Sequence, residues 1–315
     1  MLKIGNTKVK NRLVLAPMAG VNCASFRLLC HENGAGLVST PMLVANQLVA
    51  NPETIIQRTC FLKEEKPISV QIVGSDSKLM GEATKIIQEY ADIIDINLGC
   101  PEKDILALKA GSFLIKHPEQ IKKAVKPVID NTNKTVTAKI RIGWDANSIN
   151  TLDTIKILED LGISAITIHA RTKEQKYSGK ADWNEIKKAK QIAKVPIIGN
   201  GDIFLAGNAK AMIEQTGCDF VMIGRGAIGN PLLFDRTEYL LGNGKNKQEP
   251  DDEEQKQIFL KFLKYYDKYE KNRSFSELRQ QAMWFTKGIQ GAKKLRSEIM
   301  NAKTVEEILN LYKQN

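Results

Sequence analysis

The chain has 315 residues, 43% hydrophobic and 26% charged, with a formal net charge of +10, which is the composition of a globular protein with room for one large domain and a smaller one. Its apolar runs are far shorter than a membrane span and the first residues lead into no signal-peptide core, so we expect a cytoplasmic protein with no membrane partner. The five cysteines include no C-x-x-C pair, which argues against a disulfide framework and against a metal site.

Short β-branched runs alternate with amphipathic helical stretches as far as about residue 235. Eight runs are predicted as strands: Arg12–Pro17, Leu37–Ser39, Ile68–Val73, Ile93–Asn97, Thr135–Ile140, Ala165–His169, Pro196–Asn200 and Phe220–Ile223. A strand with its crossover helix needs about 30 residues, and the spacing of these runs is close to that. We therefore predict an α/β protein built on a (β/α)8 TIM barrel, with a doubly wound open sheet as the alternative.

The pattern changes after residue 240. Residues 241–254 contain glycines, a proline and a run of acids, which predicts a linker that ends at a helix start. Apolar residues then recur at helical spacing from Ile258 to Tyr269, and further helices are predicted over Phe275–Gln290, Ala292–Met300 and Val305–Tyr312. We therefore divide the chain into a barrel domain (1–240), the linker (241–254) and a small all-helical carboxyl-terminal domain (255–315).

The positive charge is concentrated in the predicted helical domain. Residues 256–315 hold 13 Lys or Arg and 6 Asp or Glu. This bias favours a polyanionic partner held by a separate module, although a merely soluble helical surface would also be basic.

A thiol directly follows the fourth predicted strand. Cys100 lies between Gly99, which lets the backbone turn closely, and Pro101, which fixes the next dihedral angle. A lone cysteine is more often a small core residue than a catalyst. The carboxyl end of a parallel strand is, however, where such proteins carry out chemistry.

The other strand ends are also rich in polar residues. If the barrel closes, one rim brings together Pro17-Met18-Ala19-Gly20, Gln71, Asn97 with Cys100, Lys139 with Arg141, His169 with Arg171, Asn200-Gly201-Asp202 and Gly224-Arg225-Gly226. The run Gly224–Gly229 matches G-x-G-x-x-G, but no strand follows it, so we reject a dinucleotide fingerprint. The same glycines, with Arg225, suit a phosphate cradle after the last two strands.

A phosphate site beside Lys139 and Gln71 indicates a phosphorylated cofactor, and Lys139 could stabilise negative charge on a reduced flavin. FMN fits better than pyridoxal phosphate, because pyridoxal chemistry would use the lysine as a Schiff base and leave Cys100 without a task. The structural alternative for Lys139 is an ion pair inside the barrel.

The sequence resembles the tRNA-dihydrouridine synthases, a family of FMN-dependent flavoproteins, over essentially its whole length. The matching segments are Leu15–Val21, Val70-Gln71-Ile72, Asn97–Pro101, Ala110-Gly111-Ser112, Lys139-Ile140-Arg141, His169-Ala170-Arg171, Asn200–Ile203 and Gly224–Ala227. The family often carries several basic residues after Cys-Pro, whereas here only Lys103 and Lys109 remain in that loop.

The resemblance implies a set of roles. The residues expected to contact FMN are Pro17, Met18, Ala19, Gln71, Lys139, His169, Asn200, Gly201, Asp202, Gly224 and Arg225. Cys100 would be the proton donor, NADPH would supply the electrons, and the helical domain would grip tRNA. We expect a monomer in which NADPH and RNA use the flavin face in turn.

The C5=C6 bond of uracil is conjugated to the C4 carbonyl, so hydride from the reduced flavin should go to C6 and a proton to C5. A protonated thiol at Cys100 could deliver that proton. We place Asn97, Arg141 and Arg171 at the substrate. For Asn97 and Arg141 the alternative is a hydrogen-bonding role inside the barrel.

A stacked or paired uridine must be extruded to reach the rim. Cations interleaved with Trp284 are typical of RNA-binding surfaces, and the candidates are Arg279, Lys287, Lys293, Lys294 and Arg296. We expect Phe285 to be helix core.

Two other functions stay open. A small-molecule FMN dehydrogenase of the dihydroorotate or dihydropyrimidine type could share the barrel, the flavin and the cysteine, but it would not need a basic helical appendage. A non-catalytic RNA-binding protein built on a barrel would bind no flavin.

Overall fold

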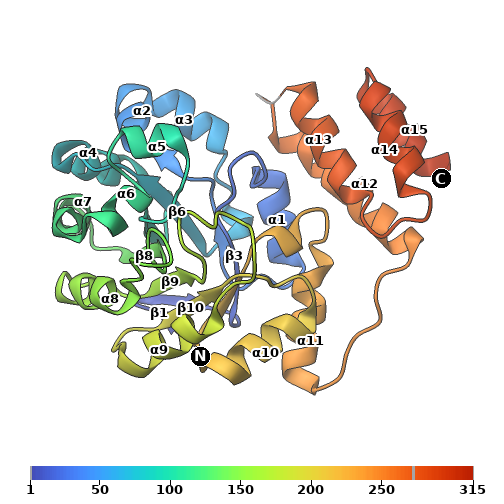
Figure 1. Cartoon of the computed structure of the whole chain (residues 1–315). Helices are drawn as coiled ribbons and strands as arrows, with labels where there is room; N and C mark the ends of the chain where they lie inside the picture. Colours follow the sequence, from blue (N-terminus) through green and yellow to red (C-terminus); the bar gives the residue numbers. More distant parts are fainter. Residues whose placement is uncertain (1, 272–273, 315) are drawn as a thin grey trace.

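The computed structural model describes residues 2–271 and 274–314. The outer limits of the two predicted domains, residues 1 and 315, and residues 272–273 lie outside the described residues. Within the described chain, a barrel of parallel strands surrounded by helices lies beside a group of four further helices (Figure 1).

Eight parallel strands form the barrel in the order β3-β11-β10-β9-β8-β7-β6-β4. A parallel bridge between Val14 and Leu37 joins the first and last of them, so the sheet closes on itself. This confirms the predicted barrel over the open sheet. The strands are β3 (Leu13–Leu15), β4 (Val38–Ser39), β6 (Ile68–Val73), β7 (Ile93–Asn97), β8 (Thr135–Arg141), β9 (Ile166–His169), β10 (Ile197–Asn200) and β11 (Phe220–Ile223).

Helices cover the outside of the barrel, with their apolar faces toward the strands. In α7, for example, Ile121, Ala124, Val125 and Val128 are buried at the i, i+3, i+4, i+7 spacing of one helix face. The barrel helices are α1 (Ala24–Glu32), α2 (Ala45–Ala50), α3 (Pro52–Thr59), α4 (Ser77–Ile87), α5 (Lys103–Ala107), α6 (Ser112–Lys116), α7 (Ile121–Asp130), α8 (Thr151–Asp160), α9 (Trp183–Ile192), α10 (Ala206–Thr216) and α11 (Leu232–Asn243).

A short antiparallel hairpin closes the amino-terminal mouth of the barrel, a feature that we did not predict. It consists of β1 (Leu2–Ile4) and β2 (Thr7–Val9). Ile4 and Val9 pack among residues of the barrel interior, and the backbone N–H of Asn6 donates to Thr135 Oγ1 at 3.1 Å. A further two-residue strand, β5 (Leu43–Val44), pairs with the end of β6. With the floor filled, the carboxyl mouth is left as the side for ligand entry.

The last four helices are α12 (Asp252–Tyr269), α13 (Phe275–Phe285), α14 (Ala292–Asn301) and α15 (Val305–Gln314), and we call them the helical region. α12 begins where Asp251 accepts a hydrogen bond from the Glu254 N–H at 2.8 Å, after the connection formed by residues 244–251. α13 ends at Phe285, earlier than predicted, because Gly288 and Gly291 adopt positive φ angles of 88° and 76°.

An aromatic core holds the helical region together. Phe259 stacks on Tyr312 with ring centroids 3.9 Å apart, and Phe262 lies 4.9 Å from Phe285. Phe285 is fully buried, as expected for helix core.

Three buried side chains of the helical region bond to the barrel. Glu270 accepts hydrogen bonds from the backbone N–H and the hydroxyl of Ser25, at 2.9 and 3.1 Å, at the start of α1. Gln281 donates to the carbonyl of Val21 at 2.9 Å, and Gln255 donates to that of Gly229 at 2.8 Å. The two parts therefore share a packed interface, and part of it lies behind the loop that follows β3.

Candidate active site

Two adjoining hollows open at the carboxyl ends of the barrel strands, and the larger has a volume of about 420 Å³. They share Pro17, Met18, Lys139, His169, Tyr177 and Arg225, so we treat them as one cavity. Cys100 and all the residues expected to contact a cofactor line it: Pro17, Met18, Ala19, Gln71, Lys139, His169, Asn200, Gly201, Asp202, Gly224 and Arg225. The structure thus brings together residues that are spread over more than 200 positions of the sequence.

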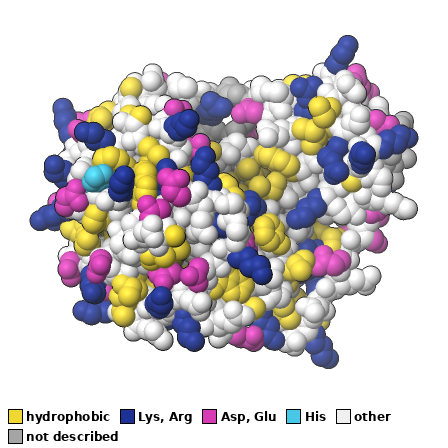
Figure 2. Space-filling model, viewed as in Figure 1, with side chains coloured by type: hydrophobic (Ala, Val, Ile, Leu, Met, Phe, Trp, Pro, Cys, Tyr) yellow, Lys and Arg dark blue, Asp and Glu magenta, His cyan; other side chains and the backbone are white. Residues whose placement is uncertain are grey.

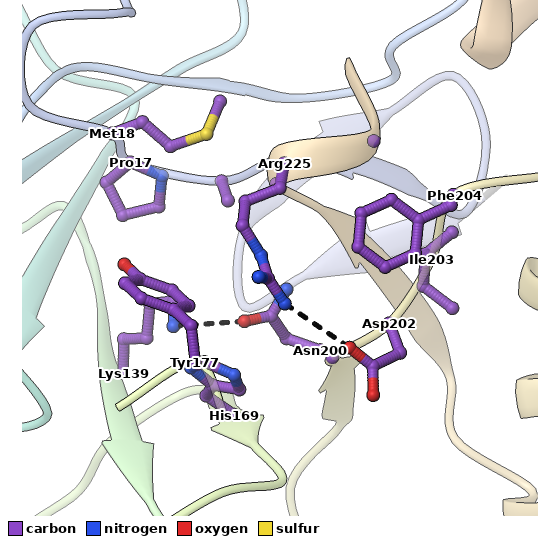
Figure 3. A pocket seen from close by; sticks show the side chains of 14 residues that line it. Pro17, Met18, Lys139, His169, Tyr177, Asn200, Asp202, Ile203, Phe204 and Arg225 are labelled. Atoms are coloured by element: carbon purple, nitrogen blue, oxygen red, sulfur yellow. Dashed lines mark hydrogen bonds and ion pairs between the residues drawn. The ribbon is translucent and has the colours of Figure 1, made fainter. Parts of the chain in front are cut away.

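Asp202 follows β10 and lines the smaller hollow (Figure 3). Both carboxylate oxygens of Asp202 lie 2.8 Å from Arg171 Nη2, and one lies 3.3 Å from Arg225 Nη2. Partial burial raises the pKa of Asp202, but the Ala181 N–H and the two guanidinium groups outweigh this and hold the pKa below its usual value. The anchored carboxylate in turn fixes the Arg225 side chain at the cavity wall.

Gly226 follows β11 in the 3-10 turn Arg225–Ala227, where only glycine fits. A Cβ atom at this position would lie 2.0 Å from the carbonyl oxygen of Ile203, too close for any side chain. The glycine therefore lets this turn pack against the loop after β10. Gly224, Arg225 and Gly226 line the smaller hollow, and the Arg225 cation makes this part of it a cradle suited to an anion.

Lys139 projects from β8 between the two hollows. Its Nζ atom donates to Asn200 Oδ1 at 3.2 Å, and Asn200 is itself held by a 2.8 Å hydrogen bond to the carbonyl of Met222. Burial and the neighbouring Arg141 lower the pKa of Lys139 from 10.5 to about 8. The lysine therefore stays mainly protonated at neutral pH, and its charge is weakly screened by water.

His169 is buried at the end of β9, next to this lysine. Burial first, and then the positive charges of Lys139 and the nearby arginines, lower the pKa of His169 well below 6.5. The imidazole is therefore neutral at physiological pH and can act as a hydrogen-bond donor or acceptor but not as a cation.

Cys100 is held at a rigid corner, as predicted from its neighbours. The side-chain oxygen of Asn97 accepts the backbone N–H groups of Gly99 and Cys100 at 3.0 and 2.8 Å, and the carbonyl of Cys100 accepts the N–H of Ser112 at 3.0 Å. The residue is only 8% exposed. Burial raises the pKa of Cys100 above 9.0, so the thiol is protonated at neutral pH. A protonated thiol suits an acid and not a nucleophile.

Two predicted substrate residues, Asn97 and Arg141, line the larger hollow. The oxygen of the Asn97 side chain is occupied by the backbone, and its nitrogen donates to Gln71 at 2.8 Å. Arg141 donates to the carbonyls of Gly99, Thr172 and Lys176 at 2.8 to 2.9 Å. Both side chains therefore brace loops of the rim as well as facing the cavity.

The third predicted substrate residue, Arg171, does not line the cavity. It is buried behind Asp202 and also donates to the carbonyls of Ser178 and Gly179, at 3.0 and 2.6 Å. The structure thus places Arg171 as a support for Asp202.

Sequence reasoning missed Tyr177, whose ring lies over the cavity mouth. The side chain is 55% exposed, and its ring centroid lies 4.8 Å from the Arg225 guanidinium and 5.7 Å from that of Arg141. Phe204, which contacts Arg225 at 5.4 Å, was missed as well. The one available signal for Tyr177 was an aromatic residue among the lysines of the loop after β9.

The helical region carries the predicted RNA-contacting cations on its surface. Lys287, Lys293, Lys294 and Arg296 are exposed, whereas Arg279 is half-buried and donates to the carbonyl of Met300 at 3.1 Å. Figure 2 shows Lys and Arg side chains gathered on this part of the molecule. The structure does not bring these cations into the cavity.

Among residues 2–271 and 274–314, no group of acidic, His or Cys side chains could hold a metal ion. In the same part of the chain, no helix is long and apolar enough to cross a membrane.

Comparison with known proteins gives one family. The sequence profile described as "Dihydrouridine synthase (Dus)" matches residues 14–315. The chain is 42% identical to tRNA-dihydrouridine synthase B of Vibrio vulnificus over 82% of this chain and 81% of that protein. It is 39% identical to tRNA-dihydrouridine synthase B of Escherichia coli over 78% of this chain and 76% of that protein.

Solved structures show the same fold at low sequence identity. The old yellow enzyme homologue from Zymomonas mobilis (NCR) superposes with a TM-score of 0.52 and 13% identity, over 79% of this chain and 93% of that one. A variant of NCR gives a TM-score of 0.55 and 16% identity, over 86% and 97% of the two chains.

Proposed function

This chain belongs to the dihydrouridine synthase family, and from that premise we propose that it reduces uridines in tRNA to 5,6-dihydrouridine, with FMN as cofactor and NADPH as electron donor. It is therefore an oxidoreductase that acts on tRNA. The alternative, a dehydrogenase for free dihydroorotate or dihydropyrimidines, gives no task to the basic helical region. Because the substrate is tRNA, we place the protein in the cytoplasm and retain the monomer as a prediction.

One observation carries the chemical proposal: a buried, protonated thiol and an anion cradle line the same cavity. Arg225 and the backbone of Gly224 and Gly226 line the smaller hollow and would hold the FMN phosphate, because the guanidinium supplies the opposite charge. When bound, FMN supplies the hydride that goes to C6 of the uracil.

Lys139 and His169 would bind the polar edge of the flavin, together with Gln71 and Asn200. The ammonium of Lys139 lies in a buried setting where its charge is effective, so it would stabilise negative charge on the reduced ring. The neutral imidazole of His169 adds a hydrogen-bonding group without a further positive charge.

Cys100 would supply the proton of the reaction. Reduction at C6 leaves an electron-rich C5 conjugated with the C4 carbonyl, and the Sγ–H of Cys100 would protonate this carbon. The burial of Cys100 keeps its thiol protonated at neutral pH.

The substrate base must leave the tRNA stack to reach the thiol, at a cost of a few kcal/mol. The exposed ring of Tyr177 at the mouth is placed to stack on an extruded base. Arg141 and the Asn97 nitrogen would contact its polar edge, and the cations of the helical region would bind phosphates.

The experiment is a comparison of wild type with Cys100→Ala. The variant should retain bound flavin and NADPH-driven flavin reduction, yet lose most dihydrouridine formation in tRNA. Wild-type turnover by this variant would remove Cys100 from the mechanism, and a purified protein without flavin absorbance would remove the cofactor.

A further inference from the structure

Asp95 is a carboxylate inside the barrel that the proposed reaction does not use. It is 4% exposed and borders a small internal space among Ile93, Ile198 and Met222, below the cavity. Burying a carboxylate in such a place is costly unless it is hydrogen-bonded. The carboxylate accepts Gln71 Nε2 and Thr137 Oγ1, each at 2.6 Å.

These bonds begin a hydrogen-bond relay across three neighbouring strands. Gln71 on β6 pairs with Asp95 on β7, and Asp95 pairs with Thr137 on β8. The relay continues from Gln71 Oε1, which accepts Asn97 Nδ2 at 2.8 Å, to Asn97 Oδ1, which accepts the N–H groups of Gly99 and Cys100. It therefore joins the barrel interior to the Cys100 corner.

The groups at the two ends of the relay determine which way the Asn97 and Gln71 side-chain amides are turned. Backbone N–H groups can only donate, so Asn97 must turn its oxygen toward Cys100 and its nitrogen toward Gln71. Gln71 must then turn its oxygen toward Asn97 and its nitrogen toward Asp95. An ionised carboxylate can only accept, which is what this position requires.

We propose that Asp95 is a positioning residue: as the terminal acceptor of this relay, it orients the Gln71 and Asn97 amides and thereby holds the Cys100 thiol in place. The inference rests on the proposed role of Cys100 and extends it to a residue that does not touch the cavity. It also leaves Gln71 one N–H for the ligand, because its other N–H donates to Asp95. Burial raises the pKa of Asp95, and the hydrogen bonds from Thr137 and Gln71 and the charge of Lys139 oppose that rise.

The relay predicts that two substitutions have non-additive effects on the reactivity of the Cys100 thiol. In Asp95→Asn, the new amide oxygen can still accept from Gln71 while the new amide nitrogen donates to the Thr137 hydroxyl, which can act as an acceptor. In Thr137→Val, the carboxylate still accepts from Gln71. Only in the double variant does the correct orientation, with the amide oxygen toward Gln71, leave the introduced amide nitrogen without an acceptor and so cost a hydrogen bond.

The test is the rate at which iodoacetamide alkylates Cys100 in the full-length protein, measured by mass spectrometry of the Cys100 peptide. We expect each single variant to stay within about threefold of wild type and the double variant to react about tenfold faster, the effect of losing one hydrogen bond. With tRNA as substrate, kcat should fall by a similar factor while KM is unchanged. Thr167→Val, also buried in the barrel interior, is the matched control.

Wild-type alkylation in the folded double variant would overturn the proposal, as would either single variant reacting as fast as the double. If the double variant fails to fold, Asp95→Leu replaces it, since it also removes the acceptor, and it should show the same increase. Alkylation is read without turnover, so a protein that makes no dihydrouridine would refute the proposed function and leave this test readable.

Discussion

Replacing Lys139 by methionine should stabilise the flavin-free protein while weakening flavin binding. Folding lowers the pKa of Lys139 from 10.5 to about 8, because the ammonium loses its hydration inside the barrel. A difference of this size corresponds to about 3 kcal/mol at neutral pH. Losing the hydrogen bond to Asn200 offsets about 1 kcal/mol, so Lys139→Met should gain about 2 kcal/mol at pH 7.

The stability that the protein gains from Lys139→Met must depend on pH. Between pH 8 and 10.5 the unfolded chain binds more protons than the native one, because its lysine has the higher pKa, so wild-type stability rises with pH in this window. The methionine variant has no such group. Its advantage should be complete below pH 8 and close to zero by about pH 10.

Urea unfolding of the flavin-free protein at pH 7 and pH 10 measures this difference. Lys85→Met, on an exposed position of α4, is the control and should show no pH-dependent gain. A Lys139→Met protein that is less stable than wild type at pH 7, or equally stabilised at both pH values, would contradict this prediction. Such a result would mean that burial of the Lys139 ammonium does not destabilise the folded protein.

Three further predictions test other parts of the structure. Gly226→Ala should abolish flavin retention, measured by absorbance of the purified protein, because its Cβ would meet the Ile203 carbonyl at 2.0 Å, whereas Gly207→Ala has open space and should bind normally. Gln281→Leu removes the bond to the Val21 carbonyl, and should cost about 1 kcal/mol and lower the melting temperature by about 2 °C; an unchanged melting temperature would show that this contact does not hold the interface. Lys293→Ala with Lys294→Ala should reduce the slope of log Kd for tRNA against log salt by about 2, and an unchanged slope would exclude these lysines as phosphate contacts.

The barrel could be predicted because each strand is a local signal. The runs Ile68–Val73, Ile93–Asn97 and Phe220–Ile223 match the observed strands residue for residue. The hairpin of β1 and β2 could not be predicted in this way, since three-residue strands carry almost no pattern and depend on contacts such as that of Asn6 with Thr135, which are distant in sequence.

The site followed from the barrel, because strand ends converge whatever their order in the chain. The residue types could not reveal which hydrogen-bond partner each polar side-chain atom has. Asn97 was expected to read the substrate, yet its oxygen is occupied by the Cys100 corner. Arg171 was expected at the substrate as well, but lies behind Asp202. Side-chain direction and burial, and not residue type, decide such roles.

The protein's central activity is tested most directly by incubating unmodified tRNA with the flavin-loaded protein and NADPH and analysing the nucleosides by mass spectrometry. We predict that wild type converts uridine to a nucleoside heavier by two hydrogens, with the properties of 5,6-dihydrouridine, and that Cys100→Ala forms little of it. Bound flavin that is reduced by NADPH while the tRNA uridines stay unchanged would contradict the proposed function.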